Sequence, residues 1–307
     1  MNALKKSRLK LFIFATFASV QILLSTSARA QDTPCAFDDA SLSYVGTPQD
    51  QARCLLRPVL IGGHLGAPFK RLPSPLDKLI GKSLKVDNDA LRLYLVAHNI
   101  SEADIGGSLS DPVARANSLD PKAPFASYFV IHDVSTPNYL DKSFPPDINE
   151  STWSLNDLKK RWANKKVTHV YINRLGESVT AVDFKTELPD PNHGTKFARD
   201  HLRNKGKGLY LHVELVQPRR SDPQGKPNND SIAPVPGFTD AQLERLALCY
   251  IAASVRRGAW LVPAFHAAID VGIPDAHDDP QNFDLARWAD HLGKLLKVIK
   301  ESGAKKK

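Results

Sequence analysis

From residue 132 onward, the chain carries side chains that can bind a metal ion or transfer protons: His132, Glu214, His266, His277 and Asp279. Neutral imidazoles and carboxylates are ligands of Zn²⁺, and two histidines with one carboxylate leave a coordination position open. Zinc lowers the pKa of water towards about 7, so such a set supports hydrolysis at neutral pH. A histidine at the end of a buried strand is also common in an ordinary core, so the residue types alone leave both interpretations open.

Other catalytic patterns in the sequence are incomplete. The segment Gly106–Ser110 (GGSLS) lacks the second glycine that the strained turn of a serine nucleophile requires. His212 and Glu214 match the H-x-E of zinc deaminases, but the paired cysteines that complete that site are absent. The sequence also has no glycine-rich phosphate loop. These observations argue against a serine hydrolase, a deaminase and a nucleotide-binding enzyme.

Segments rich in aromatic and β-branched residues are predicted to be the strands that position these side chains. One ends at His132, and in another the alternation places His212 and Glu214 on the face opposite Val213 and Leu215. A turn at Gly176 joins two of the strands. The predicted strands are Tyr128–His132, Val167–Ile172, Ser178–Phe184 and Leu209–Val216.

Helix signals are strongest after residue 237. Thr239 and Gln242 form a capping box, Phe238 and Leu243 a hydrophobic staple, and Gly258 ends the helix. Apolar residues at helical spacing predict two more helices, at Asp89–His98 and at about Phe283–Ile299. Strands mixed with helices indicate an α/β or α+β domain.

The segment Pro218–Pro236 is rich in Pro, Asn, Asp and Gly, which predicts a long surface loop bordering a binding cleft. Turn-rich stretches run to about residue 117, and the strand pattern begins after Pro124. We therefore expect an N-terminal extension at 31–117 and the main domain at 118–307.

The N-terminus has the features of a secretory signal peptide over residues 1–30. A basic segment precedes the apolar run Leu11–Leu24, and Ser27–Ala30 (SARA) offers an A-x-A cleavage site. The run is shorter than the roughly 20 residues of a spanning helix. We expect a soluble, periplasmic or secreted protein with no stable membrane insertion after signal cleavage.

The net charge bears on which partners the protein binds, and the cysteine content bears on the cellular compartment in which it folds. The formal charge of +8 falls to about +3 once the basic signal peptide is removed, which is ordinary and gives no argument for a nucleic-acid partner. The chain has three cysteines. Cys35 and Cys54 lie close together beyond the signal, so they are the predicted disulfide of an exported protein, and Cys249 in a helix pattern is the predicted buried thiol.

A series of short motifs resembles type 2 N-acetylmuramoyl-L-alanine amidases, a family that includes AmpD-type enzymes and peptidoglycan recognition proteins. The segment 129–137 (FVIHDVSTP) resembles the family's opening strand motif. Further similar segments follow in the family's order, over about Phe125 to Leu296, which is more specific than any one motif. They are 168–172 (THVYI) with Gly176, 212–216 (HVELV), 237–243 (GFTDAQL), 262–266 (VPAFH), and Asp279-Pro280 with Phe283-Asp284.

The resemblance implies a central mixed β-sheet flanked by helices, here with a disulfide-containing N-terminal extension. It makes His132, His266 and Asp279 the zinc ligands and Glu214 the acid that orients or deprotonates the attacking water. His277 stands two positions before the ligand aspartate, where relatives carry a lysine that stabilises the oxyanion, and a protonated His277 can supply that charge.

The implied activity is zinc-dependent hydrolysis of the amide bond between N-acetylmuramic acid and L-alanine in peptidoglycan or muropeptides. The spacing from His266 to Asp279 is longer than the family's by a few residues, which leaves Asp275 and Asp278 as alternative ligands. A non-catalytic peptidoglycan-binding module and a zinc peptidase that cuts within the stem peptide are the alternative functions.

Overall fold

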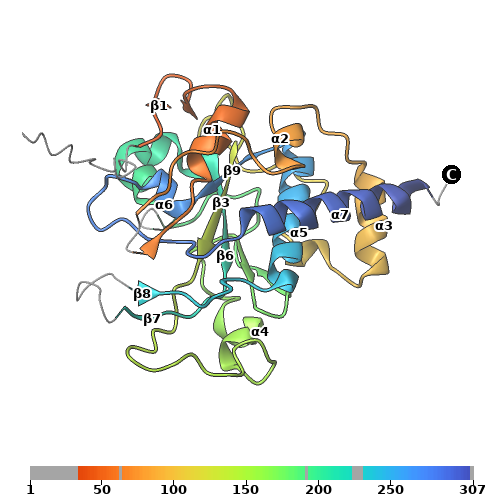
Figure 1. Cartoon of the computed structure of the whole chain (residues 1–307). Coiled ribbons are helices and arrows are strands. Elements are labelled where there is room, and N and C mark those ends of the chain that lie inside the picture. The colour runs from red at the N-terminus through yellow and green to blue at the C-terminus, as the bar shows by residue number, and fades with distance from the viewer. Residues whose placement is uncertain (1–33, 62–63, 191–192, 223–230, 305–307) are drawn as a thin grey trace, which may run out of the picture.

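A five-stranded mixed sheet lies at the centre of the molecule (Figure 1), in a computed structural model that describes residues 34–61, 64–190, 193–222 and 231–304. The strand order is β5-β4-β6-β3-β9, and among these strands β5 alone is antiparallel to its neighbour. The strands are β3 (Tyr128–Asp133), β4 (Val170–Ile172), β5 (Ser178–Thr180), β6 (Tyr210–Leu215) and β9 (Val262–Phe265). The expected signal peptide lies outside the described residues.

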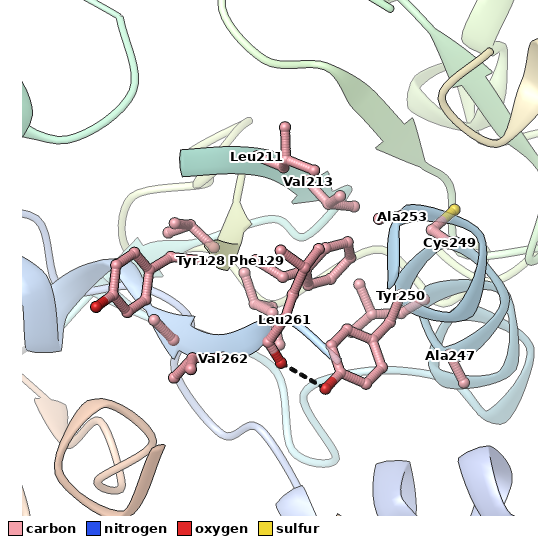
Figure 2. Close-up of a cluster of buried hydrophobic side chains, with 14 of the residues drawn as sticks. Tyr128, Phe129, Leu211, Val213, Ala247, Cys249, Tyr250, Ala253, Leu261 and Val262 are labelled. Carbon is pink, nitrogen blue, oxygen red and sulfur yellow. Dashed lines mark hydrogen bonds between the residues drawn. The ribbon is translucent and has the colours of Figure 1, made fainter. Parts of the chain in front are cut away.

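Strand register sorts the side chains onto two faces, because neighbours in register share a face. Ile131 and Val213 share one face, whereas His132 and Glu214 share the other. Helix α5 (Asp240–Arg257) covers the first face, where the rings of Phe129 and Tyr250 meet at 5.3 Å. Figure 2 shows this apolar cluster, in which the Tyr250 hydroxyl donates to the Leu261 carbonyl at 2.7 Å.

Helix α5 begins and ends where the sequence predicted. The hydroxyl of Thr239 accepts from the Gln242 N–H and the Gln242 side chain accepts from the Thr239 N–H, which confirms the capping box. Gly258 follows the helix with φ of 73°, a left-handed conformation that favours glycine. Helix α7 (Leu285–Ala304) packs across α5 and extends to α3 (Asn88–Ala97), and its Trp288 is fully buried.

Two predicted strands are shorter than expected, and their backbone hydrogen bonds explain why. The N–H groups of Ala181 and Val182 both donate to the carbonyl of His169, at 2.8 and 3.2 Å. Two residues that oppose one in this way form a bulge, which ends the regular ladder. Strand β5 therefore stops at Thr180 rather than Phe184, and β4 starts at Val170 rather than Val167.

The N-terminal segment covers the amino-terminal half of the face that carries His132. The Tyr128 hydroxyl accepts from the Tyr44 N–H at 2.8 Å and donates to Gln51 at 3.0 Å. The Cys35–Cys54 disulfide is confirmed, and Cys249 is a free buried thiol as predicted. The elements of this segment are β1 (Phe37–Asp38), β2 (Ser43–Tyr44), α1 (Pro48–Leu55), α2 (Leu76–Leu79) and α3.

One continuous apolar core includes residues of the N-terminal segment and of the sheet, such as Leu55, Leu91 and Phe129. The boundary between 117 and 118 stays a prediction. Short helical segments complete the fold: Glu102–Asp104, Ser154–Asn156, α4 (Leu158–Arg161), Ala198–Leu202, Arg203–Lys205, Lys207–Leu209 and α6 (His266–Ile269). Within the described ranges, no helix combines the length and the apolar character that crossing a membrane requires.

The prediction that Pro218–Pro236 is loop throughout was wrong in part. Strands β7 (Arg220–Ser221) and β8 (Ser231–Ile232) pair antiparallel within it. The residue before β7, Arg219, is fully buried. The loop-like composition of the segment obscured this short strand pair, and the buried arginine lies directly before its first strand.

Replacing both Cys35 and Cys54 by serine tests how the N-terminal segment is held. The disulfide closes a sequence separation of 19 residues. We expect the double variant to lose about 2–4 kcal/mol of unfolding free energy, since the unfolded chain gains freedom. Urea denaturation measures this, and reductant should lower wild-type stability by the same amount but leave the variant unchanged. Equal stability of variant and wild type would contradict the expectation.

Candidate metal centre

The predicted site residues meet at the carboxyl edge of the sheet. His132 lies at the end of β3, in register with Glu214 on β6, and His266 directly follows β9. Because β3, β6 and β9 run parallel, their carboxyl ends lie at one edge, which is the usual position of sites in open α/β sheets. Asp279 reaches this edge from the segment between α6 and α7.

Three donor groups converge at a single point. The Nδ1 atoms of His132 and His266 are 2.9 Å apart. The carboxylate of Asp279 places Oδ1 3.0 Å from Nδ1 of His266 and Oδ2 3.6 Å from Nδ1 of His132. Tetrahedral ligands at about 2.0–2.1 Å from zinc are about 3.3 Å apart, which these separations bracket. The three residues are buried, and together they could hold a metal ion.

The far nitrogen of His266 is held by a carboxylate. Nε2 of His266 lies 2.8 Å from Oδ2 of Asp270. Asp270 also accepts from the backbone N–H groups of Lys196 and Phe197, at 2.8 and 2.9 Å. Since a carboxylate accepts hydrogen bonds, Nε2 carries a hydrogen, which leaves Nδ1 as the nitrogen that can bind a metal ion once it has lost its own proton. This is the usual outer partner of a metal-binding histidine.

The far nitrogen of His132 is held by another imidazole, because its Nε2 lies 2.8 Å from Nδ1 of His212. Behind them, Nδ1 of His169 accepts from the His212 N–H at 3.0 Å, and Nε2 of His169 lies 3.0 Å from the Thr186 carbonyl. Burial lowers the pKa of His169 to about 4, and burial together with His132 and His169 lowers the pKa of His212 well below its usual value. Both rings are therefore neutral, and His169 is a satisfied core histidine.

Lone pairs and a carboxylate that converge in a buried site repel one another unless a cation or a proton lies between them. Burial and the neighbouring His266 lower the pKa of His132 to about 3. Burial acts to lower the pKa of His266 too, but Asp279 and Asp270 outweigh it and raise that pKa well above its usual value. Without a metal, the proton is therefore held on His266, and it occupies the position that suits a cation.

Glu214 lies beside His132, His266 and Asp279, and its carboxylate has a raised proton affinity. Its Oε1 is 3.9 Å from Nδ1 of His132, and its buried Oε2 has no hydrogen-bond partner within the part of the chain that the structure describes. Burial raises the pKa of Glu214 well above its usual value, and Asp279 and Asp133 raise it further. A carboxylate with a raised pKa is suited to accept a proton near neutral pH.

His277 lies at the outer rim of the group. Its side chain is 61% exposed, with Nδ1 3.7 Å from Oδ1 of Asp279 and its ring 4.7 Å from that of His266. Burial of part of the ring and the neighbouring His266 lower the pKa of His277. The neutral form is thus favoured over the protonated form expected from the sequence, and it can still donate one N–H.

Asp275 and Asp278, the alternative ligands, point elsewhere. Asp275 is exposed, and its backbone carbonyl accepts from the Lys196 ammonium group. Asp278 lies 3.6 Å from Arg219 and accepts from the Gln281 amide, and burial raises its pKa to about 6. Of these aspartates, Asp279 is the one that lies beside both histidines.

The buried ion pair of Asp133 and Arg219 lies next to Asp279. The Asp133 N–H donates to Oδ2 of Asp279 at 3.1 Å, while the Asp133 carboxylate accepts from Arg219 at 2.7 Å. No sequence pattern indicated a role for Asp133, His212, Arg219 or Asp270. The i,i+4 spacing of His266 and Asp270 was the one available signal, since Arg219 looked like an ordinary loop residue.

His132, His266, Asp279 and Glu214 line a pocket of about 240 Å³. Its walls also include Ser135, Val167 and His193. A larger hollow of about 740 Å³ lies between α3 and α7, lined by residues such as Lys82, Trp260 and Ile299. The larger hollow lacks convergent metal-binding groups among its described residues. The chemistry therefore assigns the candidate site to the smaller pocket.

No protein-family model and no curated protein matches the sequence. Among solved structures, a crystal structure of a selenomethionine derivative of AmpD is similar, with a TM-score of 0.33 and 18% identity. The match covers 61% of this chain and 97% of that chain. A similarity of this extent carries no inference about this chain.

Zinc affinity should strengthen as the pH rises. The raised pKa of His266 means that zinc must displace a proton. We expect the apparent affinity to increase by up to about tenfold per pH unit until the pH passes the His266 pKa. Competition with a chromophoric chelator measures this at several pH values.

Asp270→Asn, which removes one of the carboxylates that raise the His266 pKa, should shift this dependence to lower pH. The control is Asp290→Asn, which removes an exposed carboxylate paired with Lys294 on α7 and should leave the dependence unchanged. An affinity that does not vary with pH in the wild type would contradict proton displacement.

Proposed function

We propose that the chain is a periplasmic or secreted zinc-dependent N-acetylmuramoyl-L-alanine amidase, which hydrolyses the amide bond between N-acetylmuramic acid and L-alanine in peptidoglycan or muropeptides. The observation that carries this proposal is the convergence of His132, His266 and Asp279 beside Glu214 in one pocket. The ordered motifs between Phe125 and Leu296, which resemble this family, support the substrate class.

Each residue has a distinct part in the proposed reaction. His132, His266 and Asp279 would hold Zn²⁺, which when bound would supply Lewis acidity that polarises a carbonyl and lowers the pKa of water. Glu214 accepts a proton from the attacking water and delivers it to the amine nitrogen as the carbon–nitrogen bond breaks. The products are the lactyl carboxylic acid and the free amine of L-alanine. The neutral His277 donates an N–H to the developing oxyanion.

The disulfide is consistent with the proposed compartment. Cross-links such as Cys35–Cys54 persist in oxidising surroundings, including the periplasm and the extracellular space, and are rare in the cytosol. The substrate proposed for the pocket is found in those same surroundings. Location and substrate are therefore mutually consistent.

Product masses test the scissile bond. We expect zinc-loaded protein incubated with defined muropeptides to release the intact stem peptide and leave the glycan uncut, and a chelated sample to release neither. Fragments of the stem peptide would indicate a zinc peptidase instead. Unchanged masses at high protein concentration, together with retention on insoluble peptidoglycan, would indicate a binding module.

Substitutions at the site test the assigned roles. Glu214→Gln keeps the shape but cannot accept the proton, so zinc should still bind while kcat falls by about 10²–10⁴-fold. His132→Ala should lose both zinc and cleavage, because a ligand is missing. The matched control is Glu301→Gln, at an exposed position on α7, which should cleave normally. Normal turnover by Glu214→Gln would exclude it as the proton acceptor.

A further inference from the structure

A second buried histidine, His212, contacts the candidate ligand His132 on the side away from the metal position. It precedes Glu214 by two residues on β6, so both side chains lie on the face that carries His132. Its Nδ1 is 2.8 Å from Nε2 of His132, and both side chains are almost completely buried. His132 thus contacts the metal position with one nitrogen and His212 with the other.

Only one hydrogen fits between these two nitrogens, so the tautomers of the two rings are coupled. If the hydrogen is on Nε2 of His132, then Nδ1 of His132 presents a lone pair to His266 and Asp279. If it is on Nδ1 of His212, a neutral His132 must carry its hydrogen on Nδ1, and that hydrogen blocks metal binding. The choice between the two tautomers decides whether His132 can be a ligand.

The surroundings of His212 fix its ring in place. The ring of His169 stacks on it with centroids 5.8 Å apart and planes 9° apart, while Nδ1 of His169 accepts from its backbone N–H. Gly194 also approaches the ring: it has φ of 89°, and a Cβ atom there would lie 2.9 Å from Nε2 of His212. A larger residue at Gly194 would displace the imidazole, so the close approach depends on glycine.

His132 and His266 therefore have different outer partners. His266 faces the carboxylate of Asp270, which can only accept a hydrogen bond when ionised. His132 faces a neutral ring that can either donate or accept. The orientation of His132 therefore depends more on how its partner ring is held. An imidazole partner also adds no negative charge to a site that already contains Asp279, Asp270 and Glu214.

We propose that His212 is a positioning residue, which accepts a hydrogen bond from Nε2 of His132 and so directs the Nδ1 lone pair of His132 to the metal position. This inference rests on the proposed function, because it takes His132 to be a zinc ligand. His212 itself touches neither metal nor substrate.

A pair of variants separates this role from simple filling of space. In His212→Asn, Oδ1 takes the place of Nδ1 and can accept the same hydrogen bond, whereas His212→Leu leaves a similar volume without an acceptor. We expect Leu to weaken zinc affinity by about 10–100-fold and Asn to restore most of it, as for other outer partners of metal-binding histidines. Chelator competition gives the affinities, and His98→Leu, at an exposed histidine, is the control.

A measurement on the wild-type protein needs no substitution. Long-range ¹⁵N–¹H NMR spectra of the metal-free protein should show His132 and His212 both with their hydrogen on Nε2. A hydrogen on Nδ1 of His212 would overturn the proposal, as would equal zinc affinity of the wild type and His212→Leu, or equal losses for Asn and Leu. Failure of the wild type to bind zinc would instead refute the proposed function, and the tautomer spectrum would still show whether His212 accepts the hydrogen bond from His132.

Discussion

The central constraint on this structure is the burial of three electron-pair donors that point at one another. Nδ1 of His132, Nδ1 of His266 and the Asp279 carboxylate lie within 4.8 Å of one another in a site with little access to water. Such a group is stable only with a positive charge at its centre, supplied by a metal ion or, in its absence, by a proton on His266. The same constraint explains why the neighbouring carboxylate of Glu214 has a raised pKa: it is buried beside other negative charge.

The fold meets this constraint by surrounding each donor with a second residue that orients it. Asp270 orients His266, His212 orients His132, and the Asp133 backbone orients Asp279. Parallel strands bring these groups to one edge, and the apolar face packed by α5 keeps the strands in place. The N-terminal segment closes the amino-terminal half of the site face, where Tyr128 bonds to Tyr44 and Gln51. Strand β3, which carries His132, and strand β9, which leads to His266, are both buried along their whole length.

Local sequence patterns were sufficient for much of the fold. The capping box at Thr239, the glycine that ends α5 and the strand alternation around Glu214 depend on residues within a few positions of one another, and the structure agrees with each. The Cys35–Cys54 pair was predicted from its spacing and compartment. Strand ends were predicted less well, because the bulge at Ala181 depends on the carbonyl of His169, which lies on the neighbouring strand rather than in the local pattern.

By itself, the sequence determined which side chains were candidates for metal binding and predicted the strands that carry His132 and Glu214, since residue type and alternation are local properties. Only the tertiary structure decided that Asp279, rather than Asp275 or Asp278, lies beside both histidines, because the path of an irregular segment depends on distant contacts with Lys196 and Arg219. It also revealed the outer partners His212 and Asp133. Their importance comes from hydrogen bonds and burial, which depend on distances between strands and loops that no spacing along the chain encodes.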